Sequence, residues 1–291
     1  MTAAATAPVP LLRAGLWMTG AIVSFTSMAL AGRAVSVELD TFEIMLYRSL
    51  AGILIVLAAA SAFGTRGQIR AHRMGLHGLR NVAHFSGQNL WFFAITAAPL
   101  AQVFALEFTQ PIWAILLAPL VLSERITKVG LASAAIGFCG ILIVARPSAE
   151  TLSPGLIAAA LAAIGFAFSA LFTRRLTRTE TVTSILFWLT VMQAVLGLVC
   201  AGIDGAIAVP STAALPYVLL ISVAGLVAHF CLTTALSLAP ASLVMPIDFA
   251  RLPLVAVIGM LVYAEPLDPF VFLGAGVIVF ANWLNLTRGR T

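Results

Sequence analysis

The chain has 291 residues, of which 61% are hydrophobic and only 9% are charged, and its formal net charge is +5 at pH 7. Soluble domains carry roughly 45–50% apolar and about 25% charged residues, so this composition excludes an ordinary soluble domain and indicates a membrane protein. The positive charge does not indicate a nucleic-acid partner, because the basic residues cluster in short segments between apolar stretches, as they do in membrane proteins.

Ten apolar stretches are predicted to be membrane-spanning helices, each near the roughly 20 residues that cross a bilayer core of about 30 Å. Glycine and proline mark many of the breaks between them. The sequence therefore predicts an all-α integral membrane protein with no room for a sizeable soluble domain. In chain order the predicted helices are 11–33, 42–62, 75–97, 101–122, 128–146, 154–173, 181–202, 213–236, 241–263 and 268–286.

The basic residues orient these ten spans. If the N-terminus lies inside, the inside segments hold twelve lysines and arginines, whereas the outside segments hold only Arg33 and Arg146. Segments between spans are enriched in Lys and Arg on the cytoplasmic side. We therefore expect both termini to be cytoplasmic and the protein to be a multi-pass protein of the inner (plasma) membrane.

The chain contains an internal repeat, in which 81–124 align with 222–265 without a gap (222 − 81 = 141). Each half then holds five helices, at 1–149 and 150–291. Because five is odd, the second half is inverted relative to the first, as in secondary transporters whose substrate site lies between the repeats near the midplane. The most telling matches are the Ala-Pro turns at 98–99 and 239–240 and the closing glutamates Glu124 and Glu265.

Two stretches carry a family resemblance, PLAQVFALEFTQPIWAILLAPLVLSE at 99–124 and PASLVMPIDFARLPLVAVIGMLVYAE at 240–265. The stretch FEIMLYRSLAGILIVL at 42–57, with Arg48, supports it. On these motifs, residues 12–286 resemble the drug/metabolite transporter superfamily in its ten-helix, EamA-like branch. The resemblance implies metabolite transport through a central cavity, most often export. By general likeness the chain is most similar to bacterial exporters of amino acids, including aromatic ones.

Three charged residues lie within predicted helices of the two repeat motifs. Asp248 and Arg251 are spaced i, i+3 and can touch on one helix face, and Glu107 aligns with Asp248 in the repeat. A charge at the bilayer centre costs roughly 2.5–3.5 kcal/mol on insertion scales, so such residues face the bundle interior. They either bind substrate or a proton, or they form a structural pair that fixes helix register. Arg251 aligns with Gln110, so only the second repeat has this cation.

A polar stripe runs along the third predicted helix. Asn81, His84, Gln88 and Trp91 recur at steps of three and four residues, and the repeat partner of Gln88 is His229. The stripe lines a cavity or forms hydrogen bonds between helices. No metal site is predicted, because the two histidines have no acidic or thiol partner at ligand spacing.

Deep aromatic residues are further candidates for a cavity that would suit an apolar or aromatic side chain. For each ring taken alone, a lipid-facing or packed position is favoured over a cavity-lining one. These residues are Trp17, Trp113, Phe166 and Trp188, together with Trp91.

The sequence thus predicts a secondary transporter that exports small metabolites, with neutral or aromatic amino acids as the expected substrates, by alternating access. The alternative is a transporter of another substrate class, such as nucleosides, sugars or amphiphilic drugs. A GxxxxGK[ST] loop is lacking, so transport runs downhill or on an ion gradient. More distant alternatives are a membrane sensor and an intramembrane enzyme, although neither GxSxG nor HExxH occurs. We expect no cofactor, and as partners only a small-molecule substrate and the lipid bilayer, with a monomer as the working assumption.

Overall fold

The computed structural model describes residues 11–123, 126–146, 153–203, 205–238, 247–248 and 250–288. Within these residues the regular structure is entirely helical, which confirms the all-α prediction. The helices are α1 (Leu11–Val35), α2 (Thr41–Ala62), the short η1 (Arg66–Gln68), α3 (Met74–Ala97), α4 (Leu100–Glu107), α5 (Gln110–Leu122), α6 (Lys128–Ala145), α7 (Pro154–Leu176), α8 (Val182–Ala201), α9 (Leu215–Leu238), α11 (Arg251–Tyr263) and α12 (Pro269–Arg288).

Six helical stretches in the described part of the chain are long and apolar enough to cross a membrane. They support a multi-pass membrane protein, while the count of ten spans and the cytoplasmic termini remain predictions. Glu124, Pro240 and the first residues of the predicted helix 241–263 lie outside the described residues. The six stretches are Leu12–Val35, Thr41–Ala62, Leu100–Leu122, Pro154–Leu176, Val182–Ala201 and Leu215–Leu232.

The helix bounds repeat with the offset found in the sequence. Adding 141 to both ends of α3 (74 and 97) gives 215 and 238, the ends of α9, and adding it to α5 (110 and 122) gives 251 and 263, the ends of α11. The starts of α2 and α6, 41 and 128, likewise map onto 182 and 269, the starts of α8 and α12. The alignment of 81–124 with 222–265 therefore reflects a structural repeat.

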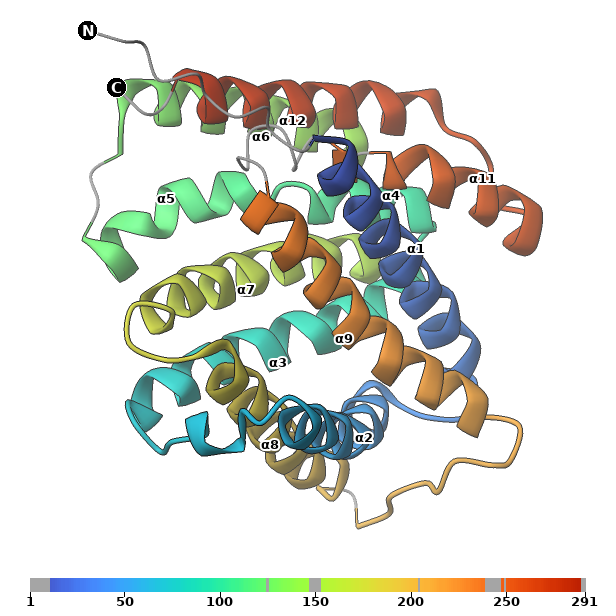
Figure 1. Ribbon diagram of the computed structural model, residues 1–291. Coiled ribbons are helices and arrows are strands. Elements are labelled where there is room, and N and C mark those ends of the chain that lie inside the picture. The colour runs from blue at the N-terminus through green and yellow to red at the C-terminus, as the bar shows by residue number, and fades with distance from the viewer. Residues whose placement is uncertain are drawn as a thin grey trace, which may run out of the picture.

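The helices pack in pairs that join the two repeats (Figure 1). α1 lies along α9, α3 along α7, α2 along α8 and α6 along α12. In the repeat, α1 corresponds to α7 and α3 corresponds to α9. The contact between α1 and α9 is therefore the counterpart of the contact between α7 and α3, as expected of two related repeats. At the α3–α7 contact a Cβ on Gly165 would lie 2.9 Å from the Cα of Gly87, so position 165 needs glycine for this close approach.

The starts of equivalent helices are capped by equivalent residues. Asp40 accepts a hydrogen bond from the backbone N–H of Glu43 at 2.8 Å, and Thr181 accepts one from the N–H of Ser184 at 3.2 Å. Asp40 and Thr181 are themselves partners in the repeat alignment (181 − 40 = 141). Such caps satisfy backbone donors that have no acceptor within the helix, so the sequence sets where α2 and α8 begin.

The predicted span 101–122 matches the apolar stretch Leu100–Leu122, but it is not one continuous helix, because it breaks at Phe108–Thr109 into α4 and α5. Pro111 has no N–H to donate to the carbonyl of Glu107, and its ring clashes with that carbonyl in a continuous helix. The side-chain N–H of Asn282 on α12 donates to the carbonyl of Phe108 at 3.1 Å, which satisfies one group exposed by the break.

The second repeat has an interruption at the equivalent place. Ile247 and Asp248 are helical, Ala250 is in a turn, and α11 begins at Arg251. The predicted helix 241–263 is therefore interrupted at Ala250, while 241–246 and 249 lie outside the described residues. The break between α4 and α5 frees backbone carbonyls within the bundle, where such groups are tolerated if protein or a wet cavity surrounds them.

Candidate functional site

The polar stripe of α3 faces the inside of the bundle, as predicted. Asn81 is 1% exposed, Gln88 5% and Trp91 2%, and His84 is buried as well. Asn81 serves helix packing: the Gln193 side chain on α8 donates to its carbonyl at 2.9 Å and to its side-chain oxygen at 3.2 Å. The other members of the stripe lie beside two polar centres.

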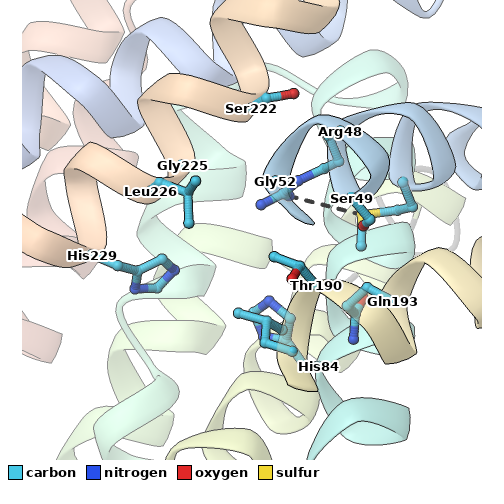
Figure 2. A pocket seen from close by; sticks show the side chains of 12 residues that line it. Arg48, Ser49, Gly52, His84, Thr190, Gln193, Ser222, Gly225, Leu226 and His229 are labelled. Atoms are coloured by element: carbon cyan, nitrogen blue, oxygen red, sulfur yellow. Dashed lines mark hydrogen bonds between the residues drawn. The ribbon is translucent and has the colours of Figure 1, made fainter. Parts of the chain in front are cut away.

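The first centre is a pocket between α2, α3, α8 and α9, two helices from each repeat (Figure 2). Its volume is about 30 Å³, enough for about two water molecules. The wall is polar on several sides, and no carboxylate occurs among the residues that line it. These residues are Met45, Arg48, Ser49, Gly52, His84, Leu189, Thr190, Gln193, Ser222, Gly225, Leu226 and His229.

Most of the pocket wall consists of repeat partners. Ser49 and Thr190 occupy equivalent positions in the alignment (190 − 49 = 141), so a hydroxyl group faces the pocket from each repeat. In the other pairs a polar residue in one repeat replaces a small or apolar residue in the other, so the chemistry of the wall is asymmetric although its frame is symmetric. These pairs are Arg48 with Leu189, Gly52 with Gln193, and His84 with Gly225.

Arg48 places the one guanidinium among the lining residues at the edge of the pocket. It donates to the side-chain oxygen of Gln88 and lies 3.8 Å from the sulfur of Met45. A Cβ on Gly225 would lie 3.0 Å from Nη2 of Arg48, so glycine at this position makes room for the guanidinium between α2 and α9.

Two imidazoles reach the pocket from α3 and α9 (Figure 2). Nδ1 of His84 lies 3.4 Å from the hydroxyl oxygen of Ser169, and its ring packs against Phe166 with centroids 6.0 Å apart. The ring of His229 packs edge-on against Phe25 at 5.5 Å. Among the described residues, no three His, Cys, Asp or Glu side chains come close enough to hold a metal ion.

The second centre lies at the two helix breaks. Nη2 of Arg251 donates to Oδ2 of Asp248 at 3.0 Å, which confirms that this pair can touch, and to Oε1 of Glu107 at 3.1 Å. The indole N–H of Trp91 donates to Oε2 of Glu107 at 2.8 Å. Trp91, a residue of the polar stripe, thus joins this centre to α3. Glu107 and Asp248, which are partners in the repeat, both bind the guanidinium of Arg251.

Aromatic rings enclose this guanidinium, and Arg251 is only 3% exposed. The centroids of Phe25, Phe104 and Phe108 lie 5.0, 4.9 and 5.3 Å from its Cζ. A cation over aromatic faces within about 6 Å is attracted by the ring quadrupoles, most strongly where water is excluded. The cage therefore holds Arg251 in place between the two carboxylates.

The remaining predicted residues lie apart from the pocket wall. The Gln110 side chain donates to the carbonyl of Phe166 at 3.4 Å. Trp17 is 37% exposed and packs against Phe230, Trp113 packs against Phe138, and Trp188 donates to the carbonyl of Arg70 at 2.8 Å. The structure does not bring these three tryptophans together around one cavity.

The comparison with protein families matches the chain twice. The model of the EamA-like transporter family matches residues 12–146 and again 153–287. The chain belongs to this family. The second match starts and ends at the positions of the first plus 141 (153 − 12 and 287 − 146), the same offset as in the sequence and in the helix bounds. The resemblance to the EamA-like branch of the drug/metabolite transporters is thus confirmed.

Relatives of this EamA-like chain are named as transporters. A riboflavin transporter of Brucella anthropi is 30% identical over 243 residues, covering 82% of this chain and 85% of the relative. A riboflavin transporter of Vibrio cholerae is 26% identical, covering 93% and 91%. An S-adenosylmethionine uptake transporter of Rickettsia bellii is 24% identical, covering 91% and 90%. These names agree with a carrier rather than an enzyme.

The fold is also that of a solved protein. A crystal structure with 18% sequence identity superposes with a TM-score of 0.63 and covers 93% of this chain and 95% of that one. Together with the six apolar spans and the family, the relatives identify this EamA-like protein as a multi-pass protein of the inner membrane.

Several pocket residues of this EamA-like chain were not predicted as site residues, among them Ser49, Thr190 and Ser222. Single hydroxyl groups in apolar helices are common and carry no signal of their own. The repeat offset would have found them, because Ser49 pairs with Thr190, and Ser222 is the partner of Asn81 in the predicted stripe (222 − 81 = 141).

Proposed function

We propose that the protein is a carrier for a neutral, hydroxyl-bearing heteroaromatic solute of the riboflavin class, which it moves across the inner membrane by alternating access. The relatives support this class, since riboflavin and S-adenosylmethionine both join a flat heteroaromatic ring to a hydroxylated sugar or sugar-alcohol chain. They do not support amino acids as substrates, the class expected from general likeness. The broader alternative of another substrate class takes its place.

The observation that carries the proposal is the chemistry of the pocket between the repeats. Hydroxyl groups, an amide, two imidazoles and one guanidinium line it without a carboxylate. Such a wall offers hydrogen bonds to ring carbonyls and hydroxyl groups, whereas the sulfonium cation of S-adenosylmethionine would face Arg48 without a compensating anion. A like charge placed in this way disfavours a ligand, so riboflavin fits better.

The pocket must widen to hold such a solute. Its volume of about 30 Å³ is far below the roughly 300–1,000 Å³ of pockets for drug-sized ligands. In the conformation seen here the pocket is therefore too small to hold the solute. Rocking of one repeat against the other would open it, as in other carriers built from repeats. The pairs α2–α8, α2–α9 and α3–α8 are contacts between the repeats beside the pocket.

Counterflow in proteoliposomes tests the proposal. Vesicles loaded with unlabelled riboflavin receive a trace of labelled riboflavin outside, with no ion gradient, beside parallel samples with adenosine, S-adenosylmethionine and phenylalanine. We expect labelled riboflavin to accumulate transiently in vesicles with protein and not in protein-free vesicles. Accumulation of phenylalanine alone would overturn the proposed class in favour of amino acids. Export, the direction expected from the resemblance, stays a prediction, since exchange works in both directions.

A further inference from the structure

The cluster of Glu107, Asp248 and Arg251 carries an unbalanced charge. Two carboxylates meet one guanidinium, so with all three groups ionised the net charge is −1. Removing one charge from water is costly, and an ion pair offsets this cost only for the groups that it neutralises. One further positive charge, a proton or another small cation, would balance the cluster.

The two carboxylates differ in how well they are satisfied. Both oxygens of Glu107 accept a hydrogen bond, Oε1 from Arg251 and Oε2 from Trp91. Asp248 accepts one only at Oδ2, while its Oδ1 is buried without a partner among the described residues, as is Nε of Arg251. Hydrogen bonds to a carboxylate favour its charged form. Asp248 is therefore the carboxylate with more to gain from a proton.

The surroundings of Asp248 hold few other charges in the part of the chain that the structure describes. Arg251 on α11 and Glu107 on α4 are the charged groups that face it. α1 presents the ring of Phe25 to Arg251, and His229 of α9 packs behind that ring. α3 presents the neutral indole of Trp91, and α12 presents the amide of Asn282 to the neighbouring break. Within these described surroundings, the missing positive charge does not come from a neighbouring arginine or lysine.

Protons can reach the cluster at the carboxylates. The side chain of Asp248 is 15% exposed and that of Glu107 16%, whereas that of Arg251 is only 4% exposed. The acids are the partly exposed members of the centre, and the guanidinium lies in the aromatic cage. A proton can therefore be exchanged at Asp248 while the guanidinium stays enclosed.

We propose that Asp248 is the site at which the carrier binds one proton in each transport cycle. Binding converts the carboxylate to a neutral carboxyl group and changes the cluster charge from −1 to 0. It also weakens the bond from Arg251 to Asp248, which lies within the second repeat, and leaves the guanidinium bonded to Glu107 at the end of α4 in the first repeat. Protonation thereby changes how Arg251 is shared between the two repeats, and solute movement becomes coupled to a proton gradient. This inference rests on the proposed carrier function.

A proton gradient tests the coupling. Proteoliposomes with the membrane potential clamped receive riboflavin at equal pH and then with a difference of one pH unit. One proton per solute molecule would change the steady-state ratio of inside to outside riboflavin about tenfold, since one pH unit corresponds to about 1.36 kcal/mol. The ratio rises toward the alkaline side for symport and falls for antiport. We expect Asp248→Asn to abolish this response and Asp248→Glu to restore it.

Asp268→Asn is the matched control. Asp268 pairs with Arg146 at the edge of the bundle, away from the cluster, so its loss should leave the tenfold response intact. Wild-type protein that performs counterflow but does not respond to the gradient would overturn the proton site and leave the carrier function standing. Absence of counterflow with every solute would instead overturn the carrier function. Proton binding to the cluster can then be tested by a measurement that needs no solute.

Tryptophan fluorescence gives that solute-free measurement. Because the Trp91 indole donates to Glu107, protonation within the cluster changes its surroundings, and the difference between wild type and Trp91→Phe isolates its signal during a pH titration. We expect one transition in this difference signal. The transition should be absent when the same difference, with and without Trp91→Phe, is measured in the Asp248→Asn background. A flat wild-type difference would overturn the proposal even if Asp248→Asn fails to fold. A transition that persists in Asp248→Asn and disappears in Glu107→Gln would move the proton to Glu107 and overturn it as well.

Discussion

Gly140 on α6 and Gly274 on α12 each occupy the space that a side chain on the other would need. A Cβ on Gly140 would lie 2.8 Å from the carbonyl oxygen of Gly274, and a Cβ on Gly274 would lie 2.7 Å from the carbonyl oxygen of Gly140. Small residues of this kind let helix backbones approach closely in membranes, where the hydrophobic effect does not drive helices together. The α6–α12 contact therefore depends on backbone proximity.

Gly140→Ala and Gly274→Ala should each destabilise the protein by about 1–3 kcal/mol, the usual cost of overpacking. The obstructing atoms include backbone atoms of the opposite helix, which cannot move aside as a side chain can, so the helices must separate to make room. Thermal unfolding in detergent, followed by the loss of monodisperse protein, measures the effect as a lower Tm. Gly276→Ala is the control on the same helix, because a Cβ there meets nothing within 4 Å. Equal Tm values for all three variants would contradict the explanation.

Glu265 joins three segments at one end of the bundle. Its carboxylate pairs with Arg33 at the end of α1, and its Oε2 accepts from the backbone N–H of Leu100, the first residue of α4, at 2.9 Å. Glu265→Gln removes the charge that both partners require. Because hydrogen bonds to charged groups contribute about 1.5–3 kcal/mol, we expect a loss of stability of that order, measured as a lower Tm.

Glu38→Gln serves as the control for Glu265, since Glu38 lies in an exposed turn and bonds to the exposed Ser211. Its loss should cost about 0.5 kcal/mol or less, as is usual for surface substitutions. The structural role of Glu265 would be refuted if the two variants unfolded at the same temperature.

The repeat was the part of the fold most open to prediction from sequence. The offset was found in 81–124, yet it also relates the bounds of α3 to those of α9 and the starts of α6 and α12. The break at Phe108–Thr109 escaped prediction because the apolar run continues through it. Pro111 is equally compatible with the first turn of a new helix and with a kink in a continuous one.

Only the polar residues of the candidate site could be predicted from the sequence, because polarity restricts where a side chain can lie in a membrane protein. Asp248, Arg251 and the stripe around Gln88 had to face the interior, because lipid cannot satisfy them. Trp17 and Trp188 are amphipathic and find favourable surroundings in lipid, in the core or at the interface, so their positions depend on neighbouring helices that one sequence does not reveal. The contribution of Ser49 becomes visible only once α2 and α8 are seen side by side.

Orientation in the membrane is testable at two exposed positions. Val37, after α1, is 92% exposed, and Phe63, after α2, is 81% exposed. In a background with the three native cysteines replaced by alanine, a membrane-impermeant thiol reagent should label Val37→Cys in intact cells. It should label Phe63→Cys only after permeabilisation, if α2 crosses the membrane and the N-terminus is cytoplasmic. The reverse pattern would invert the topology, and labelling of both in intact cells would mean that α2 does not span.

Arg48 is the group in the pocket whose loss should weaken solute binding most. Arg48→Gln keeps a hydrogen-bond donor but removes the charge and the planar fork of donors, so a charge-assisted bond to a ring carbonyl of the solute is lost. At about 1.5–3 kcal/mol per bond, riboflavin should bind roughly 10- to 150-fold more weakly, measured as the Kd in detergent. The Kd of Arg48→Lys should lie between those of the wild type and Arg48→Gln, because lysine restores the charge without the planar fork of donors.

Arg66→Gln is the matched control, since Arg66 is exposed in η1 outside the pocket. Its Kd should equal that of the wild type. The Tm of Arg48→Gln must be measured alongside, because Gln88 loses its donor in this variant. A lower Tm with an unchanged Kd would show that Arg48 holds α2 against α3 and contributes nothing to the solute. An unchanged Tm with a raised Kd would identify the guanidinium as part of the binding site and locate that site between the two repeats.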